Sequence, residues 1–378
     1  MKISLIKYLF PLLIWTLLLS CQNDKTLEFI REAQNNLMVS QPDIALNLLA
    51  SIPNPESMDE YNYMKYIVIH IGAKYEAQED IKRDTLILEA QKYFSKKGNA
   101  HDQTLANFYA AQFYHINDDY PKALEYYMYA TYQADKSNNH LVAGRSFNNI
   151  GSIYYEEDLY DNAISNYKKA WSHYNKVNDI ELKKIKTLIN LGQSFEGINQ
   201  LDSASFFYNK ALDKSIETNN KKFQNASLIN LGEIAYTMQE YDKTIKYLQS
   251  VLAMDITDNT QTKQINLCLL NTYNKRQDSE SAKQYADLVT TSLPEVTYIY
   301  TIKETYAALS EYYKQLGDYK QALQYSDLES KTMEQIQKER QIPKLLAVDK
   351  NFHISQKEQK TDKLLKYKQY TRYIEELF

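Results

Sequence analysis

FNNIGSIY, residues 147–154, is the stretch that decides the fold of this chain, because closely similar stretches follow it at regular distances. The two copies are LINLGQSF at 188–195 and LINLGEIA at 228–235. Their glycines, Gly151, Gly192 and Gly232, are 41 and 40 residues apart. A fixed period of this length predicts an array of repeated supersecondary units instead of one globular core.

Each copy is followed by a short turn and by a second amphipathic segment that begins at an aspartate, at residues 161–170, 202–211 and 242–251. An aspartate at the start of a helix caps free N–H groups and meets the positive end of the helix dipole. Small residues such as Gly151 and Ala163 let two helices cross at close range, while Tyr154 and Tyr167 fill the space between neighbouring pairs. The sequence therefore predicts stacked helix–turn–helix units.

This spacing resembles the tetratricopeptide repeat. Gly151, Tyr154, Ala163, Tyr167 and Ala170 fit its pattern of small and aromatic positions, and the next copy fits it equally well. Weaker copies lie at residues 111–130, 270–282 and 310–322, so that the resemblance covers about residues 26–335. It implies an all-α fold, a right-handed α-α superhelix. The period near 40 exceeds the ordinary 34 residues of this repeat, and we expect helices longer by about one and a half turns.

Composition excludes several classes of function. The net charge of −4 argues against a protein that binds a nucleic-acid backbone. The chain has no glycine-rich phosphate loop, no His-Glu-x-x-His pair and no Cys-x-x-Cys pair, and its six histidines are scattered. We therefore expect no enzymatic activity, no cofactor and no metal. The 34 tyrosines fit either the codon usage of an AT-rich genome or an aromatic-lined binding surface.

The N-terminus predicts export. Lys2 and Lys7 precede an apolar run over residues 8–19, which is too short for a membrane span. The following Leu-Leu-Ser-Cys at 18–21 resembles a bacterial lipobox, in which a peptidase cuts before Cys21 and the thiol is lipidated. The alternative is an uncleaved anchor with an incidental cysteine. The other cysteine, Cys268, lies on an apolar helix stripe and is interpreted as a small core residue.

The repeat pattern stops near residue 333, where Lys, Glu and Gln become dominant. Leu345, Val348 and Phe352 form one apolar stripe, and residues 364–378 carry another at three- and four-residue spacing, which is typical of an amphipathic or weakly coiled-coil helix. Pro343 is expected to kink or end the helix. The predicted organisation is a signal peptide at 1–20, a linker and capping helix pair at 21–57, a repeat array at 58–332 and a C-terminal helix at 333–378.

In a superhelix of helix pairs, the first helices line the inner face. The resemblance places on this face Tyr109, Arg145, Asn149, Tyr155, Lys186, Asn190, Gln193, Asn230 and Tyr236. The three asparagines occupy the same position in successive repeats, and amide side chains both donate to and accept from a peptide backbone. The alternative is that these asparagines only help neighbouring helices to pack. No pair of carboxylates stands out from the sequence.

These features predict a non-enzymatic, lipid-anchored scaffold that binds a peptide or protein partner. The layout resembles Bacteroidetes tetratricopeptide lipoproteins and sensor-type proteins of that group, which favours the bacterial cell envelope and the outer membrane, on the periplasmic or the surface side. One alternative is a sensory arm that relays binding to a signalling partner. Another is a glycan-uptake lipoprotein, although the tight repeat spacing leaves no room for the long loops of such proteins.

Overall fold

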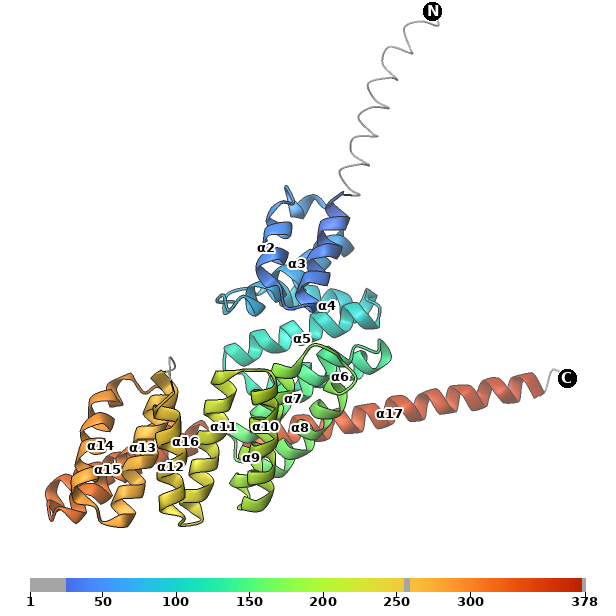
Figure 1. Cartoon of the computed structure of the whole chain (residues 1–378). Helices are drawn as coiled ribbons and strands as arrows, with labels where there is room; N and C mark the ends of the chain where they lie inside the picture. The colour runs from blue at the N-terminus through green and yellow to red at the C-terminus, as the bar shows by residue number, and fades with distance from the viewer. Residues whose placement is uncertain (1–24, 255–258, 376–378) are drawn as a thin grey trace, which may run out of the picture. The chain divides into compact units, whose positions relative to one another are not determined.

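A computed structural model describes residues 25–254 and 259–375 (Figure 1). Within these ranges the chain is helical and contains no strand, and the helices form the successive pairs of a superhelical repeat array, so the predicted fold class is confirmed. The chain divides into two compact units, the first made of residues 1–146 and 344–378 and the second of residues 147–343. The predicted signal peptide and Cys21 lie outside the described residues.

The first unit begins with a helical segment at residues 25–38, which packs with α2. Ile30, Ala33, Ala45 and Leu49 form the small core of this pair together with α3. The helices of the unit are α2 (Pro42–Ala50), α3 (Glu60–Glu76), α4 (Leu86–Lys97), α5 (Ala100–Ile116) and α6 (Tyr120–Lys136), with a short 3-10 turn η1 (Pro55–Ser57).

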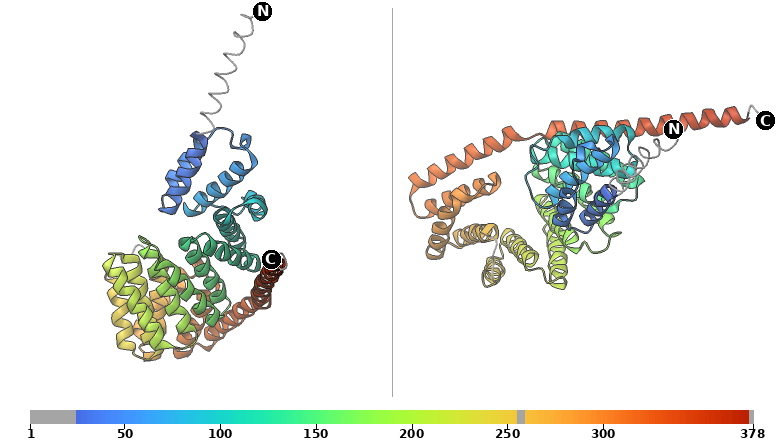
Figure 2. Two further views of the ribbon diagram at one scale, coloured as in Figure 1. Left: turned by 90° about the vertical axis from the view of Figure 1, so that its right-hand side faces the viewer. Right: turned by 90° about the horizontal axis from the view of Figure 1, so that it is seen from above.

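Helix α7 (His140–Glu156) crosses the division, and the second unit holds the helix pairs that follow it in the chain (Figure 1). The first helices of its later pairs, α9, α11, α13 and α15, contact one another in order, and each second helix contacts the next first helix. Figure 2 shows this stacking of α9 to α14 from a second side. The bounds are α8 (Tyr160–Tyr174), α9 (Glu181–Gly197), α10 (Leu201–Glu217), α11 (Lys221–Thr237), α12 (Tyr241–Leu252), α13 (Asn259–Arg276), α14 (Ser279–Ser292), η2 (Leu293–Glu295), α15 (Ile299–Gln315) and α16 (Tyr319–Glu339).

The long period has a simple structural cause. Helices α5, α6, α7, α9, α10 and α11 are each 17 residues long and are joined mostly by connections of three residues, which gives 20 residues per helix. The middle residue of such a connection, for example Asp158 or Asn199, has a positive φ of 58° or 59°. The N–H of Asn199 bonds to the carbonyl of Glu196, and the next N–H bonds to that of Phe195. These are Schellman caps, in which asparagine or aspartate occupies the position that glycine usually takes.

The repeated glycines make room for a side chain of the partner helix. A Cβ at Gly151 would lie 2.7 Å from the Tyr167 ring, and one at Gly192 would lie 2.4 Å from the Tyr208 ring. Both tyrosines are buried on the second helix of the same pair. At Gly232 the neighbour is Leu248, with a nearest distance of 3.0 Å. The glycine position therefore accommodates a large side chain, and this contact sets the crossing of each pair.

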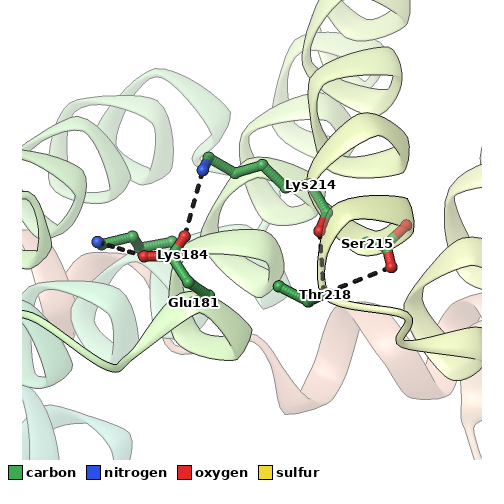
Figure 3. Close-up of polar contacts among 5 residues, drawn as sticks. All are labelled: Glu181, Lys184, Lys214, Ser215 and Thr218. Carbon is green, nitrogen blue, oxygen red and sulfur yellow. Dashed lines mark hydrogen bonds and ion pairs between the residues drawn. The ribbon is translucent and has the colours of Figure 1, made fainter.

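The ends of the α9–α10 pair are joined by a charged bridge (Figure 3). Glu181, in the first turn of α9, lies 2.7 Å from the Lys184 ammonium and 3.2 Å from that of Lys214, in the last turn of α10. The Lys184 hydrogen bond is the main cause of the lowered pKa of Glu181. Because these groups are partly exposed, each pair contributes at most about 1 kcal/mol, with a further small gain from the helix dipoles.

The C-terminal segment is one helix, α17 (Ile342–Glu375), that begins after α16 has ended at Glu339. Pro343 thus lies in the first turn of a new helix, where its missing N–H breaks no bond. The predicted boundary at residue 333 falls inside α16, whose Ile336 is still buried. The stripe at the start of α17 packs within the first unit: Leu345 is buried, and the Phe352 ring lies 5.5 Å from that of Tyr129. The second stripe involves side chains that the structure does not describe.

Among the helices of the described residues, none is both long enough and apolar enough to cross a bilayer.

Candidate binding site

Two of the predicted inner-face residues lie in the first unit. Arg145 forms an ion pair with Glu76, and both side chains are largely buried. The guanidinium also lies 4.4 Å from the centre of the Phe108 ring, and Tyr109 is buried against Gly72. Although burial opposes its charge, the carboxylate of Glu76 raises the pKa of Arg145. Arg145 is therefore already neutralised inside the chain and is not a free clamp for a ligand.

The predicted asparagine row differs from one repeat to the next. Asn190 donates to the side-chain oxygen of Asn148 at 3.3 Å, and Thr187 donates to the same atom at 3.2 Å, so Asn190 joins two neighbouring helices. Asn230 is only 4% exposed, and Asn149 is half-buried. The tertiary structure thus gives Asn190 and Asn230 packing positions, because adjacent first helices approach each other along this row.

The other predicted residues, all in the second unit, are more accessible. Lys186 is exposed on α9. Gln193, about three turns after the start of the same helix, is half-buried. Tyr155 and Tyr236 are half-buried on α7 and α11. Tyr155 interacts with Tyr298, which directly precedes α15. Tyr300 of α15 donates a hydrogen bond to the backbone carbonyl of Glu156 at 3.1 Å. The superhelix of the second unit therefore curves until α15 meets the end of α7.

This curvature brings together three glutamates that we call the acidic trio: Glu196 on α9, Glu233 on α11 and Glu304 on α15. Glu196 accepts a hydrogen bond from the Tyr208 hydroxyl at 2.8 Å, and Glu233 accepts one from the Gln264 amide at 2.9 Å. Within the described part of the chain, no lysine, arginine or histidine forms an ion pair with any of the three. Their charges interact with one another although α13 separates α11 from α15.

Burial disfavours the ionised form of all three glutamates. Burial, followed by the charges of Glu196 and Glu304, raises the pKa of Glu233 to about 8. Burial is also the main cause of the raised pKa of Glu196 and of Glu304. Glu304 nevertheless remains exposed to solvent, so it is surrounded by protein and still reached by water, as expected on a concave surface. A carboxylate in this position attracts any cationic group that enters.

A pocket of about 260 Å³ opens beside the trio, between α11, α13 and α15. Its lining is Tyr236, Asn271, Asn274, Lys275, Glu304, Ala307, Ala308 and Glu311. Asn274 is 2% exposed and donates its amide N–H to the carbonyl of Ala308 at 3.0 Å, which leaves its Oδ1 atom without a hydrogen-bond partner. A buried acceptor without a partner is costly, and here it belongs to a residue that lines the pocket.

Comparison with known proteins agrees with this architecture. Residues 143–215 match the family model of the tetratricopeptide repeat. The match identifies tetratricopeptide repeats in this segment of the chain. A search of curated proteins returns no match.

Several solved structures share the fold at low sequence identity. The apo form of RapI is 12% identical with a TM-score of 0.65, over 83% of this chain and 99% of that one. The apo quorum sensor NprR from B. thuringiensis is 15% identical with a TM-score of 0.61, over 81% and 98%. A Rap protein complexed with competence and sporulation factor is 13% identical with a TM-score of 0.59, over 84% and 100%. These likenesses establish the fold alone.

The sequence analysis missed the acidic trio. Its members are separated by 37 and 71 residues, and each falls on a helix rich in other charges. Repeat alignment places Glu196 and Glu233 on first helices, but Glu304 comes near only because the superhelix curves. The signal that could have revealed the trio is a glutamate on each of three first helices, on the inner side, with no lysine at the matching position of a neighbouring first helix.

Two other titratable groups have structural surroundings. His115 contacts the Tyr127 hydroxyl at 3.2 Å, and burial lowers the pKa of His115 to about 4, so it is neutral at physiological pH. Cys268 is buried, and burial raises the pKa of its thiol, as expected for a core residue. Within the described residues, no group of three or more His, Cys, Asp or Glu side chains is arranged to hold a metal ion.

Proposed function

We propose that this chain is a non-catalytic scaffold that binds a peptide or an extended protein segment on the inner face of its second unit. The observation that carries the proposal is the pocket between α11, α13 and α15. It opens on the first helices of three successive pairs, and it combines an aromatic wall at Tyr236 with solvent-reached polar groups. First helices of stacked pairs provide the extended concave surfaces on which repeat proteins bind their partners.

The fold likeness supports the same class of ligand. One similar structure is a Rap protein complexed with competence and sporulation factor, and another is NprR in complex with its cognate peptide NprX, at 16% identity and a TM-score of 0.58. The likeness at this identity concerns the fold, so peptide binding by this chain rests on its own pocket and inner-face residues.

The scaffold is proposed to be attached to a bacterial membrane through a lipid on Cys21. The support is the sequence alone: a positive start, an apolar run and a cysteine preceded by a small residue. Lipidation at this position would anchor the repeat array in the bacterial cell envelope, with the outer membrane as the expected site, on its periplasmic or its surface side.

A photo-crosslinking amino acid tests the binding proposal without knowledge of the partner. It is placed at Gln193 on the inner face of α9 and, as a matched control, at the exposed Lys210 on α10. In intact cells we expect a discrete adduct from position 193, identified by mass spectrometry, and none from position 210. Adducts from position 210 alone, or from neither position, would refute binding on the inner face.

A second candidate function, a regulatory arm, is favoured by one set of contacts. The connection between α16 and α17 returns to the turn after α7: Arg340 pairs with Asp158, and the backbone N–H of Gln341 donates to both carboxylate oxygens of Glu157, at 3.0 and 2.9 Å. A ligand that changes the curvature of the second unit would strain these contacts. If this arm relays binding, Arg340→Gln should leave crosslinking from position 193 intact and change the cellular response; an unchanged response would remove this candidate.

A further inference from the structure

The pocket beside the acidic trio has a specific chemistry, which rests on the binding function proposed above. Three kinds of group line it: the carboxylates of Glu304 and Glu311, the side chain of Asn274, whose buried Oδ1 atom has no hydrogen-bond partner, and the ring of Tyr236. Carboxylate and amide oxygens are hydrogen-bond acceptors, and the face of a tyrosine ring attracts cations. The lining therefore offers acceptors and a π surface and needs a ligand that brings positive charge and N–H donors.

Glu304 is the best-placed carboxylate for such a ligand. Glu311 already accepts a hydrogen bond from the Gln315 amide at 3.1 Å and lies 4.0 Å from the Lys314 ammonium. Glu304 makes no ion pair within the described residues; its neighbour Lys303 lowers its pKa only partly against the effect of burial. The charges of Glu196 and Glu233 act on the same region, because each interacts with Glu304. A cation here would pair with the Glu304 carboxylate and would favour the ionised forms of Glu196 and Glu233, because burial raises the pKa of both groups, that of Glu233 to about 8.

The size of the pocket decides what kind of cation fits. A volume of about 260 Å³ is below the range of roughly 300–1,000 Å³ that is typical for whole small-molecule ligands. Ala307 and Ala308 contribute small side chains to its lining, and the remaining volume suits one side chain better than a whole ligand. A metal ion does not fit, since none of the described His, Cys, Asp and Glu side chains form a group that could hold one.

We propose that this pocket is the specificity site of the scaffold and holds the cationic side chain of a lysine or an arginine from the bound polypeptide. The ammonium or guanidinium group bonds to Glu304 and to the Oδ1 atom of Asn274, and its methylene chain lies against Tyr236. Tyr236 and Asn274 position the group, while the acidic trio supplies the attraction.

Lys275 of the chain itself is the alternative occupant, because it lines the same pocket. Its side chain is exposed, however, and it forms no ion pair with a described carboxylate. If Lys275 were the natural occupant, replacing it by methionine would open the pocket and change the preference of the scaffold for peptides that carry a lysine or an arginine. Under the proposal, Lys275→Met leaves that preference unchanged or strengthens it.

The test is selection from a random-peptide display library by the purified chain, in four forms: wild type, Glu233→Gln/Glu304→Gln, Lys275→Met, and Glu280→Gln as a control at an exposed position of α14. We expect wild type, Lys275→Met and Glu280→Gln to enrich peptides with a lysine or arginine at one fixed position. The double variant should still enrich peptides but lose that preference. The double variant replaces two carboxyl groups whose ionised forms are disfavoured by burial, so we expect it to fold, which a melting curve verifies.

A synthetic pair of peptides completes the test. The best selected peptide is compared with its analogue in which the cationic residue is replaced by norleucine. On the wild type the replacement should weaken binding at least tenfold, and on the double variant by less than threefold, which isolates the pairwise coupling. The wild-type affinity should also fall as salt concentration rises.

The outcomes separate the two proposals. Selected peptides without a fixed cationic position, or a cation preference that survives in the double variant, would overturn the assignment of this pocket while leaving peptide binding in place. Loss of the preference in Lys275→Met would overturn it in favour of the internal lysine. No selection by the wild type would count against peptide binding itself.

Discussion

Replacing Gly192 by alanine should destabilise the protein, whereas the same change at Gly232 should not. The two glycines occupy the same position in successive repeats, and both are buried in the middle of a first helix. They differ in what a new Cβ would meet. At Gly192 it would lie 2.4 Å from a ring atom of Tyr208, and at Gly232 it would lie 3.0 Å from the end of the flexible Leu248 side chain.

The expected magnitudes follow from two opposing contributions. Alanine in a helix is favoured over glycine by about 1 kcal/mol, and this gain applies at both positions. Overpacking costs roughly 1–3 kcal/mol. Tyr208 is fully buried, and its hydroxyl bonds to Glu196, so its ring moves only with loss of that bond. We expect Gly192→Ala to lose about 1–2 kcal/mol of unfolding free energy and Gly232→Ala to be neutral or stabilised by up to about 1 kcal/mol.

Urea unfolding followed by circular dichroism measures the two midpoints. Because repeat arrays do not always unfold in one step, hydrogen exchange of the α9–α10 pair provides a local measure. Adding Tyr208→Leu to Gly192→Ala should recover part of the loss, since the shorter side chain moves away from the new methyl group. Equal midpoints for the two alanine variants would refute the view that the glycine position exists to admit the partner ring.

Three further predictions concern single groups. The pKa of Glu233 in the folded chain, about 8, lies above its ordinary value of 4.5, so the folded state keeps a proton that the unfolded chain releases, and stability falls as pH rises between these values. Glu233→Gln should therefore raise the melting temperature more at pH 9 than at pH 4. An equal rise at both pH values would contradict this prediction. Glu76→Gln should lower the free energy of unfolding by roughly 3 kcal/mol in a denaturant titration, because it leaves Arg145 buried without its partner. The control Glu79→Gln, which lines the same pocket as Arg145, should change it little, and similar losses for the two variants would speak against a buried pair. Cys21→Ser should abolish incorporation of labelled palmitate and move the protein from the membrane fraction to the soluble fraction; retention of the label would exclude Cys21 as the lipidation site.

The sequence by itself determined the repeat. Gly151, Gly192 and Gly232 recur at a spacing that only helix pairs of constant length produce, and each helix follows from contacts within about twenty residues. The same local rules placed the start of α2 at Pro42 and the end of a helix before Pro343. Helix periodicity and the space beside a glycine are readable because they depend on near neighbours. The predicted aspartate caps were wrong: Asp161, Asp202 and Asp242 are the second residues of their helices, and the three N-cap positions make no side-chain hydrogen bond.

The tertiary structure alone decided the site. Whether Arg145 is free or paired depends on Glu76, which lies 69 residues away, and whether an asparagine reaches solvent depends on how tightly two first helices approach. The meeting of Glu196, Glu233 and Glu304 depends on the accumulated curvature of successive pairs. A small rotation at each step sets that curvature, and no single repeat encodes it, so the pocket and its charge become visible only when the whole second unit has folded.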